Sequence, residues 1–141
     1  MLKPAIFFML LTISFNGFCQ TNIAANTTVI NDSTIYTVVD SVAYFPGGMI
    51  ERNKFVGKNM NPGVGSDNGI KLGKYVVVIK FEVTSEGALI NFQKATKFGH
   101  GLEDEVMRCL KLSPNWIPAK RNGLNVNSIT EFRQLFVFDQ M

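Results

Sequence analysis

The stretch "KYVVVIKFEVT", residues 74–84, is the strongest secondary-structure signal in this 141-residue chain. Apolar side chains alternate along it, at Tyr75, Val77, Ile79, Phe81 and Val83. Polar side chains occupy several of the intervening positions, which predicts a β-strand with one buried face. The turn residues Ser85–Gly87 follow, and "ALINFQKAT", residues 88–96, returns as a second strand. We therefore expect an antiparallel hairpin.

Helical signals lie on both sides of this hairpin. The "FPGG" turn at 45–48 precedes an apolar pattern that Pro62 and Gly63 end: Met49, Phe55, Val56 and Met60. Residues 63–69, "GVGSDNG", follow a helix rather than a strand, so we interpret them as a flexible connector and not a phosphate loop. Residues 102–112 begin with acidic and end with basic side chains, which favours a second helix.

The last apolar segment, "SITEFRQLFVFD" at 128–139, alternates again and predicts a third strand. The expected order is therefore helix, strand, strand, helix, strand. This order predicts an α+β fold in which helices pack on a three-stranded antiparallel sheet, with the domain spanning residues 45–141. A sheet of this kind has exposed edges.

The N-terminal segment has the features of an export signal. Residues 1–19 carry one lysine, an apolar run over 5–15 and small or polar residues before Gln20, as in a secretory signal peptide. The run is shorter than the ~20 apolar residues of a membrane span, so we predict cleavage and a polar lead-in over 20–44. A retained inner-membrane anchor that faces the periplasm is the alternative.

Composition and motifs give no sign of catalysis. The formal net charge is +3 and the basic residues are dispersed, so we expect no nucleic-acid partner. His100 is the single histidine, and no cysteine or second histidine lies at metal-ligand spacing. Cys109 fits the apolar face of the second helix, and Glu103–Glu105 point in different directions on it. We predict no enzyme activity, no metal and no cofactor.

Three motifs resemble the C-terminal domain of TonB-type energy transducers of the Bacteroidetes type. These are "GLEDEVMRCLKLSPNWIPAKRNGLNV" (101–126), "TVVDSVAYFPGG" (37–48) and "KFVGKNMNP" (54–62). In the most specific of them, a helix ends at a Pro-x-Trp-x-Pro sequence and an Asn-Gly turn precedes the last strand. The residues of the structural signature are Pro46, Gly47, Gly48, Gly87, Pro114, Trp116, Pro118 and Gly123.

The resemblance implies a periplasmic module of TonB-dependent transmembrane transport. In the family, a peptide near the N-terminus of an outer-membrane receptor adds as a strand beside the last strand, and inner-membrane motor proteins supply energy. The implied partner-binding residues are Ser128, Ile129, Thr130, Glu131, Phe132, Arg133, Gln134 and Leu135. Proline at Gln134 should then weaken peptide capture. The alternatives are a free interaction module without energy transduction and a homodimer through the same edge.

Trp116 lies between Pro114 and Pro118, in the crossing from the second helix to the last strand. An indole can bury about 150–250 Å². Its position between two prolines, which stiffen the chain, favours a structural role. We therefore predict that Trp116 joins the helix to the sheet and does not contact a partner.

Overall fold

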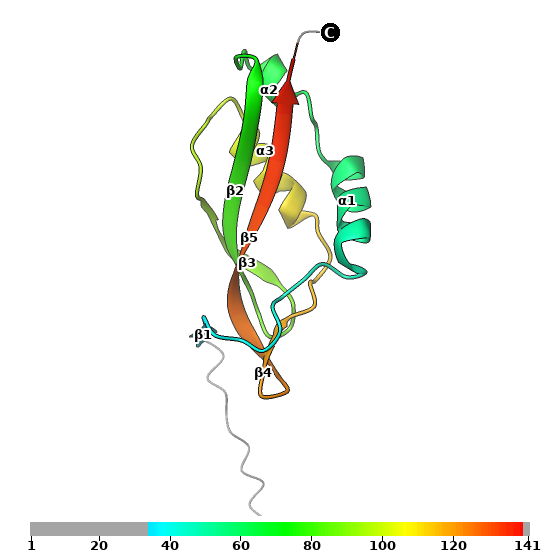
Figure 1. Cartoon of the computed structure of the whole chain (residues 1–141), viewed down its shortest axis with the longest axis vertical. Coiled ribbons are helices and arrows are strands. Elements are labelled where there is room, and N and C mark those ends of the chain that lie inside the picture. Colours follow the sequence, from blue (N-terminus) through cyan, green and yellow to red (C-terminus); the bar gives the residue numbers. More distant parts are fainter. Residues whose placement is uncertain (1–33, 140–141) are drawn as a thin grey trace, which may run out of the picture.

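Strand β2, Gly73–Val83, is central to the structure, a computed structural model that describes residues 34–139 (Figure 1). One edge of β2 pairs antiparallel with β3, Leu89–Lys94. The other edge pairs antiparallel with β5, Leu124–Phe138, in an unbroken register from Gly73↔Phe138 to Val83↔Ser128. The predicted α+β class and the predicted hairpin are confirmed.

The sheet contains more than the three strands that we predicted. Strand β1, Ile35–Tyr36, pairs parallel with β5, and β4, Ala119–Arg121, pairs antiparallel with it. The result is a mixed, five-stranded sheet, so the purely antiparallel three-stranded arrangement is wrong. A strand of three residues carries no measurable alternation, and the sequence therefore gives no signal for β4.

Strand β5 begins at Leu124, earlier than the predicted start at Ser128. Asn122 and Gly123 have φ angles of 52° and 75°, the left-handed geometry of a tight hairpin turn between β4 and β5. Because the turn is this short, pairing resumes directly after Gly123. The Asp40 Oδ2 atom accepts a hydrogen bond of 2.6 Å from the Asn122 N–H and fixes the turn.

The predicted helices are present as α1, Gly48–Asn59, and α3, Leu102–Lys111. The predicted connector over 63–69 is wrong, because it contains a short helix, α2, Val64–Asp67. Gly65 in α2 is buried, and a Cβ atom there would overlap the ring of Phe138. Glycine at this position serves close packing and not flexibility.

The core lies between α3 and one face of the sheet. The buried side chains from β2 are the predicted alternate set without Tyr75, and α3 and β5 supply most of the others: Val77, Ile79, Phe81, Val83, Leu102, Val106, Leu110, Phe132, Phe136 and Phe138. Cys109 is also buried, as its place in the apolar pattern predicts. Desolvation raises the pKa of its thiol above the ordinary value, so the thiol stays protonated.

Trp116 joins the helix side of the core to the sheet, as predicted. Its ring packs edge-on against Phe81 and Phe45, at centroid distances of 5.3 and 6.1 Å. The indole Nε1–H donates to the Ser113 Oγ atom at 2.9 Å, and the backbone N–H donates to the Gly87 carbonyl oxygen at 2.8 Å. The crossing before β4 is therefore fixed to the β2–β3 turn.

The folded part of the chain extends upstream of the "FPGG" turn. Ala43 is buried in the core, and Tyr36 and Val39 pack against it. Tyr44 and Ile117 exchange two backbone hydrogen bonds of 3.0 and 2.8 Å. The predicted domain limits stay predictions, since the signal segment 1–19 and the lead-in up to residue 33 lie outside the described residues.

The acidic residues at the start of α3 have separate partners, as their spacing predicts. Glu103 accepts from the backbone N–H groups of Phe98 and Gly99, and Asp104 pairs with Lys94 at 2.6 Å. Glu105 accepts two hydrogen bonds from Arg108, of 2.9 and 2.6 Å. They do not form one carboxylate cluster.

Glu105 gives the fold a testable dependence on pH. The hydrogen bonds from Arg108 hold its pKa below the ordinary value of 4.5, and the Asn61 N–H adds another hydrogen bond at 2.6 Å. A lowered folded-state pKa stabilises the protein above the unfolded pKa, and the contribution disappears as pH falls through the folded value. We expect Glu105→Gln to lose about 1.5–3 kcal/mol at neutral pH.

The measurement is urea unfolding of the native protein and Glu105→Gln at about pH 7 and about pH 3, on either side of the carboxyl titration. The stability difference between the two proteins should shrink at the lower pH. A difference that is the same at both pH values would show that the carboxylate form of Glu105 does not stabilise the fold.

Candidate functional site

Strand β5 has one paired edge and one largely open edge. β2 covers the first edge along its whole register, whereas β1 meets the second edge only at Asn127 and Ser128. Within residues 34–139, no strand pairs with this second edge from Ile129 to Val137. We name this segment of β5, residues 129–137, the open edge.

The hydrogen bonds of β2 show which backbone groups of β5 face outward. The Val78 N–H donates to the Thr96 Oγ1 atom at 3.1 Å, and the Val78 carbonyl oxygen accepts from the Ala95 N–H at 2.9 Å. Both groups of Val78 thus face the β3 side. Backbone groups alternate along an antiparallel strand, so those of Val78's neighbours face β5.

Arg133 lies opposite Val78, and its N–H and C=O therefore point away from β2. The same alternation makes every second residue of the open edge available to an added strand: Ile129, Glu131, Arg133, Leu135 and Val137. Gln134 lies opposite Val77, so its N–H faces β2. Proline at Gln134 would break the core ladder, and it is the wrong test of the open edge.

The predicted binding residues all lie on β5, but their backbone groups do not all face the same edge. Ser128, the first of them, lies opposite Tyr36 of β1. The backbone N–H and C=O groups of Thr130, Phe132 and Gln134 face β2, on the paired edge. The Phe132 ring is buried. Of the eight residues, Ile129, Glu131, Arg133 and Leu135 present their backbone groups outward.

Side chains around the open edge combine apolar and paired charged groups. Ile129, Leu135 and Val137 are exposed on the sheet face opposite α3. Between them, Glu131 is bound to Arg133 at 3.0 Å and to Lys80 at 3.3 Å. The hydrogen bond from Arg133, followed by that from Lys80, holds the pKa of Glu131 below its ordinary value. Glu131 thus remains ionised at neutral pH.

A hollow of about 400 Å³ lies where the open edge begins. Its walls come from β5 and from the segment 36–43 that leaves the sheet after β1. Ser128 is one of the residues that line it, and the Ser128 hydroxyl is buried and has no hydrogen-bond partner among the described residues. The unsatisfied Ser128 hydroxyl thus lies within the structure near the start of the open edge.

A cluster of side chains suited to metal binding is absent from the described part of the chain. Over residues 34–139, no group of three or more His, Cys, Asp and Glu side chains is placed to hold a metal ion. The exposed His100 has its Nδ1 atom 2.9 Å from the Asn68 carbonyl oxygen. The unpaired backbone groups of the open edge are thus the feature that suggests a function.

Comparison of the chain with family models, with curated proteins and with solved structures finds no match. Across residues 34–139, each helix is too short or too polar to cross a membrane. The sequence indicated the strand that carries the candidate site, but not the pairing of β1 with it, the hollow beside Ser128 or the direction of the backbone groups. The run "TIYTVV" at 34–39 was the one available signal for β1.

Proposed function

We propose that this protein is a TonB-like periplasmic module that binds the N-terminal peptide of an outer-membrane receptor by strand addition. The peptide pairs with the open edge of β5 and so takes part in TonB-dependent transmembrane transport. The observation that carries the proposal is the outward N–H and C=O groups of alternate residues from Ile129 to Val137. An extended peptide satisfies such groups with main-chain hydrogen bonds.

The ends of this proposed site follow from its neighbours. β1 pairs parallel with β5 opposite Asn127 and Ser128, and Tyr36 therefore bonds to the residues on either side of Ser128. The groups left for an added strand begin after the Ile129 N–H. At the other end, the Leu135 carbonyl oxygen accepts a hydrogen bond of 3.0 Å from the Gln134 side-chain amide. A carbonyl oxygen has two acceptor positions, and a peptide N–H can therefore bind there beside the Gln134 amide or in its place.

The resemblance of the motifs around Trp116 and the "FPGG" turn to TonB-type transducers supports this function over other uses of an open edge. Trp116 and Gly87 connect the crossing segment to the β2–β3 turn, and the crossing leads through β4 into β5. The signature residues thus position the strand on which we place the peptide. Inner-membrane motor proteins would complete the energy transfer that the resemblance implies.

Leu135→Pro and Gln134→Pro form a matched pair that tests strand addition. Leu135→Pro removes an outward N–H and should leave the protein folded, because β-strands tolerate proline where the missing N–H faces solvent. It should weaken peptide binding about ten-fold or more, through the lost hydrogen bond and the bulk of the ring. Titration calorimetry with a synthetic receptor N-terminal peptide measures this loss.

Gln134→Pro should instead destabilise the fold, because it leaves a β2 carbonyl oxygen without its partner at a cost of about 1–3 kcal/mol. Circular dichroism during urea unfolding reports both stabilities. A folded Leu135→Pro variant with undiminished affinity for the peptide would refute pairing at the open edge.

A further inference from the structure

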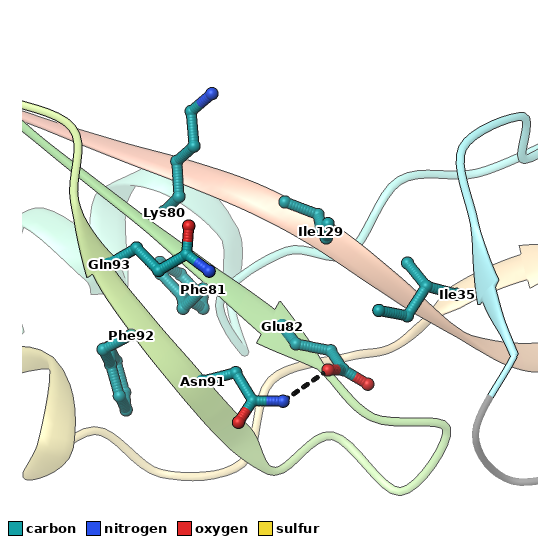
Figure 2. Close-up of a pocket in the computed structure, with 8 residues that line it drawn as sticks. All are labelled: Ile35, Lys80, Phe81, Glu82, Asn91, Phe92, Gln93 and Ile129. Carbon is teal, nitrogen blue, oxygen red and sulfur yellow. Dashed lines mark hydrogen bonds between the residues drawn. The ribbon is translucent and has the colours of Figure 1, made fainter.

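A second hollow, of about 610 Å³, lies on the sheet face opposite α3 (Figure 2). β2 contributes Lys80 and Glu82 to it, and β3 contributes Asn91 and Gln93. Ile129 of β5 and Ile35 of β1 complete the wall, so four strands meet around it. We name this feature the face hollow.

A β-bulge shapes the polar side of the face hollow. Lys80 lies opposite Gln93 while Glu82 lies opposite Ile90, so β3 has one residue more than β2 over this interval. Asn91, within the bulge, has a φ of 53°, in the left-handed region that asparagine tolerates better than most residues. Bulges re-aim side chains, and here the Asn91 Nδ2 atom donates to the Glu82 Oε2 atom at 2.9 Å.

Glu82 is an unusual group to place there, because only 7% of it is exposed and it has no cationic partner in the described part of the chain. Asn91 binds one carboxylate oxygen, and Figure 2 shows the other pointing away from Asn91. A buried carboxylate is costly unless a charge or several hydrogen bonds compensate it. The face hollow thus contains a negative charge with unused acceptor capacity.

The nearest basic side chain does not supply the missing charge. Lys80 lines the same hollow, but its Nζ atom pairs with the Glu131 Oε1 atom at 3.3 Å. Figure 2 shows the Lys80 side chain extending away from Glu82. The acceptor capacity of Glu82 is therefore available to a cation from outside the described chain.

We propose that the face hollow binds an alkylammonium or guanidinium group. The positive charge pairs with the Glu82 carboxylate oxygen that Asn91 does not bind, and the aliphatic stem lies against Ile35 and Ile129. The cation comes either from a small free amine or from a basic side chain of a bound peptide. The face hollow shares Ile129 with the open edge, but the charge of Glu82 plays no part in strand addition, so each proposal can fail without the other.

NMR titration of the isotopically labelled protein tests the proposal with defined probes. n-Butylammonium should shift the side-chain amide signals of Asn91 and Gln93 in a saturable way, whereas neutral 1-pentanol should bind at least about ten-fold more weakly. A short peptide with a single arginine, compared with its citrulline twin, tests the second source of the cation. Binding of arginine peptide without binding of n-butylammonium would assign the hollow to a peptide side chain.

Glu82→Gln tests whether the charge of Glu82 binds the cation, because glutamine keeps an acceptor for Asn91 and removes the charge. It should lower the affinity for both cationic probes about ten-fold or more, with unfolding midpoints matched to the native protein. Glu51→Gln, which alters an exposed carboxylate on α1 that pairs with Lys54 and does not line the hollow, is the control and should retain binding. Equal binding of charged and neutral probes, or an unaffected Glu82→Gln variant, would overturn the proposal.

Discussion

Trp116→Ala is expected to lower the free energy of unfolding by about 3–5 kcal/mol, the range for large aromatic residues removed from a core. Trp116 is 6% exposed and packs edge-on against Phe45, which precedes α1, and against Phe81 of β2. Among the described residues, no other aromatic ring packs against both Phe45 and Phe81. Its loss leaves a cavity at the junction of the sheet with the "FPGG" turn.

Urea unfolding followed by circular dichroism measures the effect of Trp116→Ala. Ser113→Ala is the matched control, because it removes only the acceptor of the 2.9 Å hydrogen bond from the indole Nε1–H. That variant should lose about 1–3 kcal/mol, the cost of leaving a part-buried donor unsatisfied. If both variants lose the same amount, the packing of the ring contributes little and the structural role of Trp116 is wrong.

Gly87→Ala is expected to destabilise the protein by about 3 kcal/mol or more. Gly87 has a φ of 88°, where an L-residue costs about 1–2 kcal/mol. A Cβ atom at this position would also overlap the carbonyl oxygen of Trp116. The turn must then move away from the crossing segment and lose the hydrogen bond between the Trp116 N–H and the Gly87 carbonyl oxygen.

Gly123→Ala separates these two costs. Gly123 has a φ of 75°, and a Cβ atom there meets nothing within 4 Å, so this variant bears only the conformational cost. Thermal unfolding of both variants should show a clearly larger loss for Gly87→Ala. Equal losses would mean that close contact between the β2–β3 turn and Trp116 is not what requires glycine.

Trp116 and Gly87 both belong to the connection that positions β5. The crossing segment is fixed by Trp116 to Gly87 and by Ile117 to Tyr44, and it leads through β4 and the Asn122–Gly123 turn into the long strand. Backbone hydrogen bonds at these two places thus hold the chain upstream of β5, ahead of the residues that pair with β2. The open edge that we propose as the peptide site depends on this connection.

Local patterns in the sequence were sufficient to predict the long helices and strands. The alternation over 74–84 predicted β2, the return over 88–96 predicted β3, and the charge order over 102–112 predicted α3. The setting of Trp116 between two prolines also predicted its place in the core. Each of these signals lies within one element, where side-chain periodicity reflects burial on one face.

The short elements and both candidate sites could not be predicted in this way. β1 and β4 have too few residues for a period, and α2 lies in a glycine-rich run that resembles a loop. The face hollow requires a bulge at Asn91 and side chains from four strands. Such arrangements depend on contacts between distant segments.

The sequence by itself determined that β5 is a strand, because the alternation of side chains over residues 128–139 can be recognised without any partner strand. Only the tertiary structure decided which backbone groups of that strand are free. The direction of an N–H is defined relative to the neighbouring strand, and the register with β2 turns Gln134 inward and Leu135 outward. Side-chain alternation limits the possible registers, but it does not say which edge of β5 the neighbouring strand occupies, and this is fixed only when the strands pair.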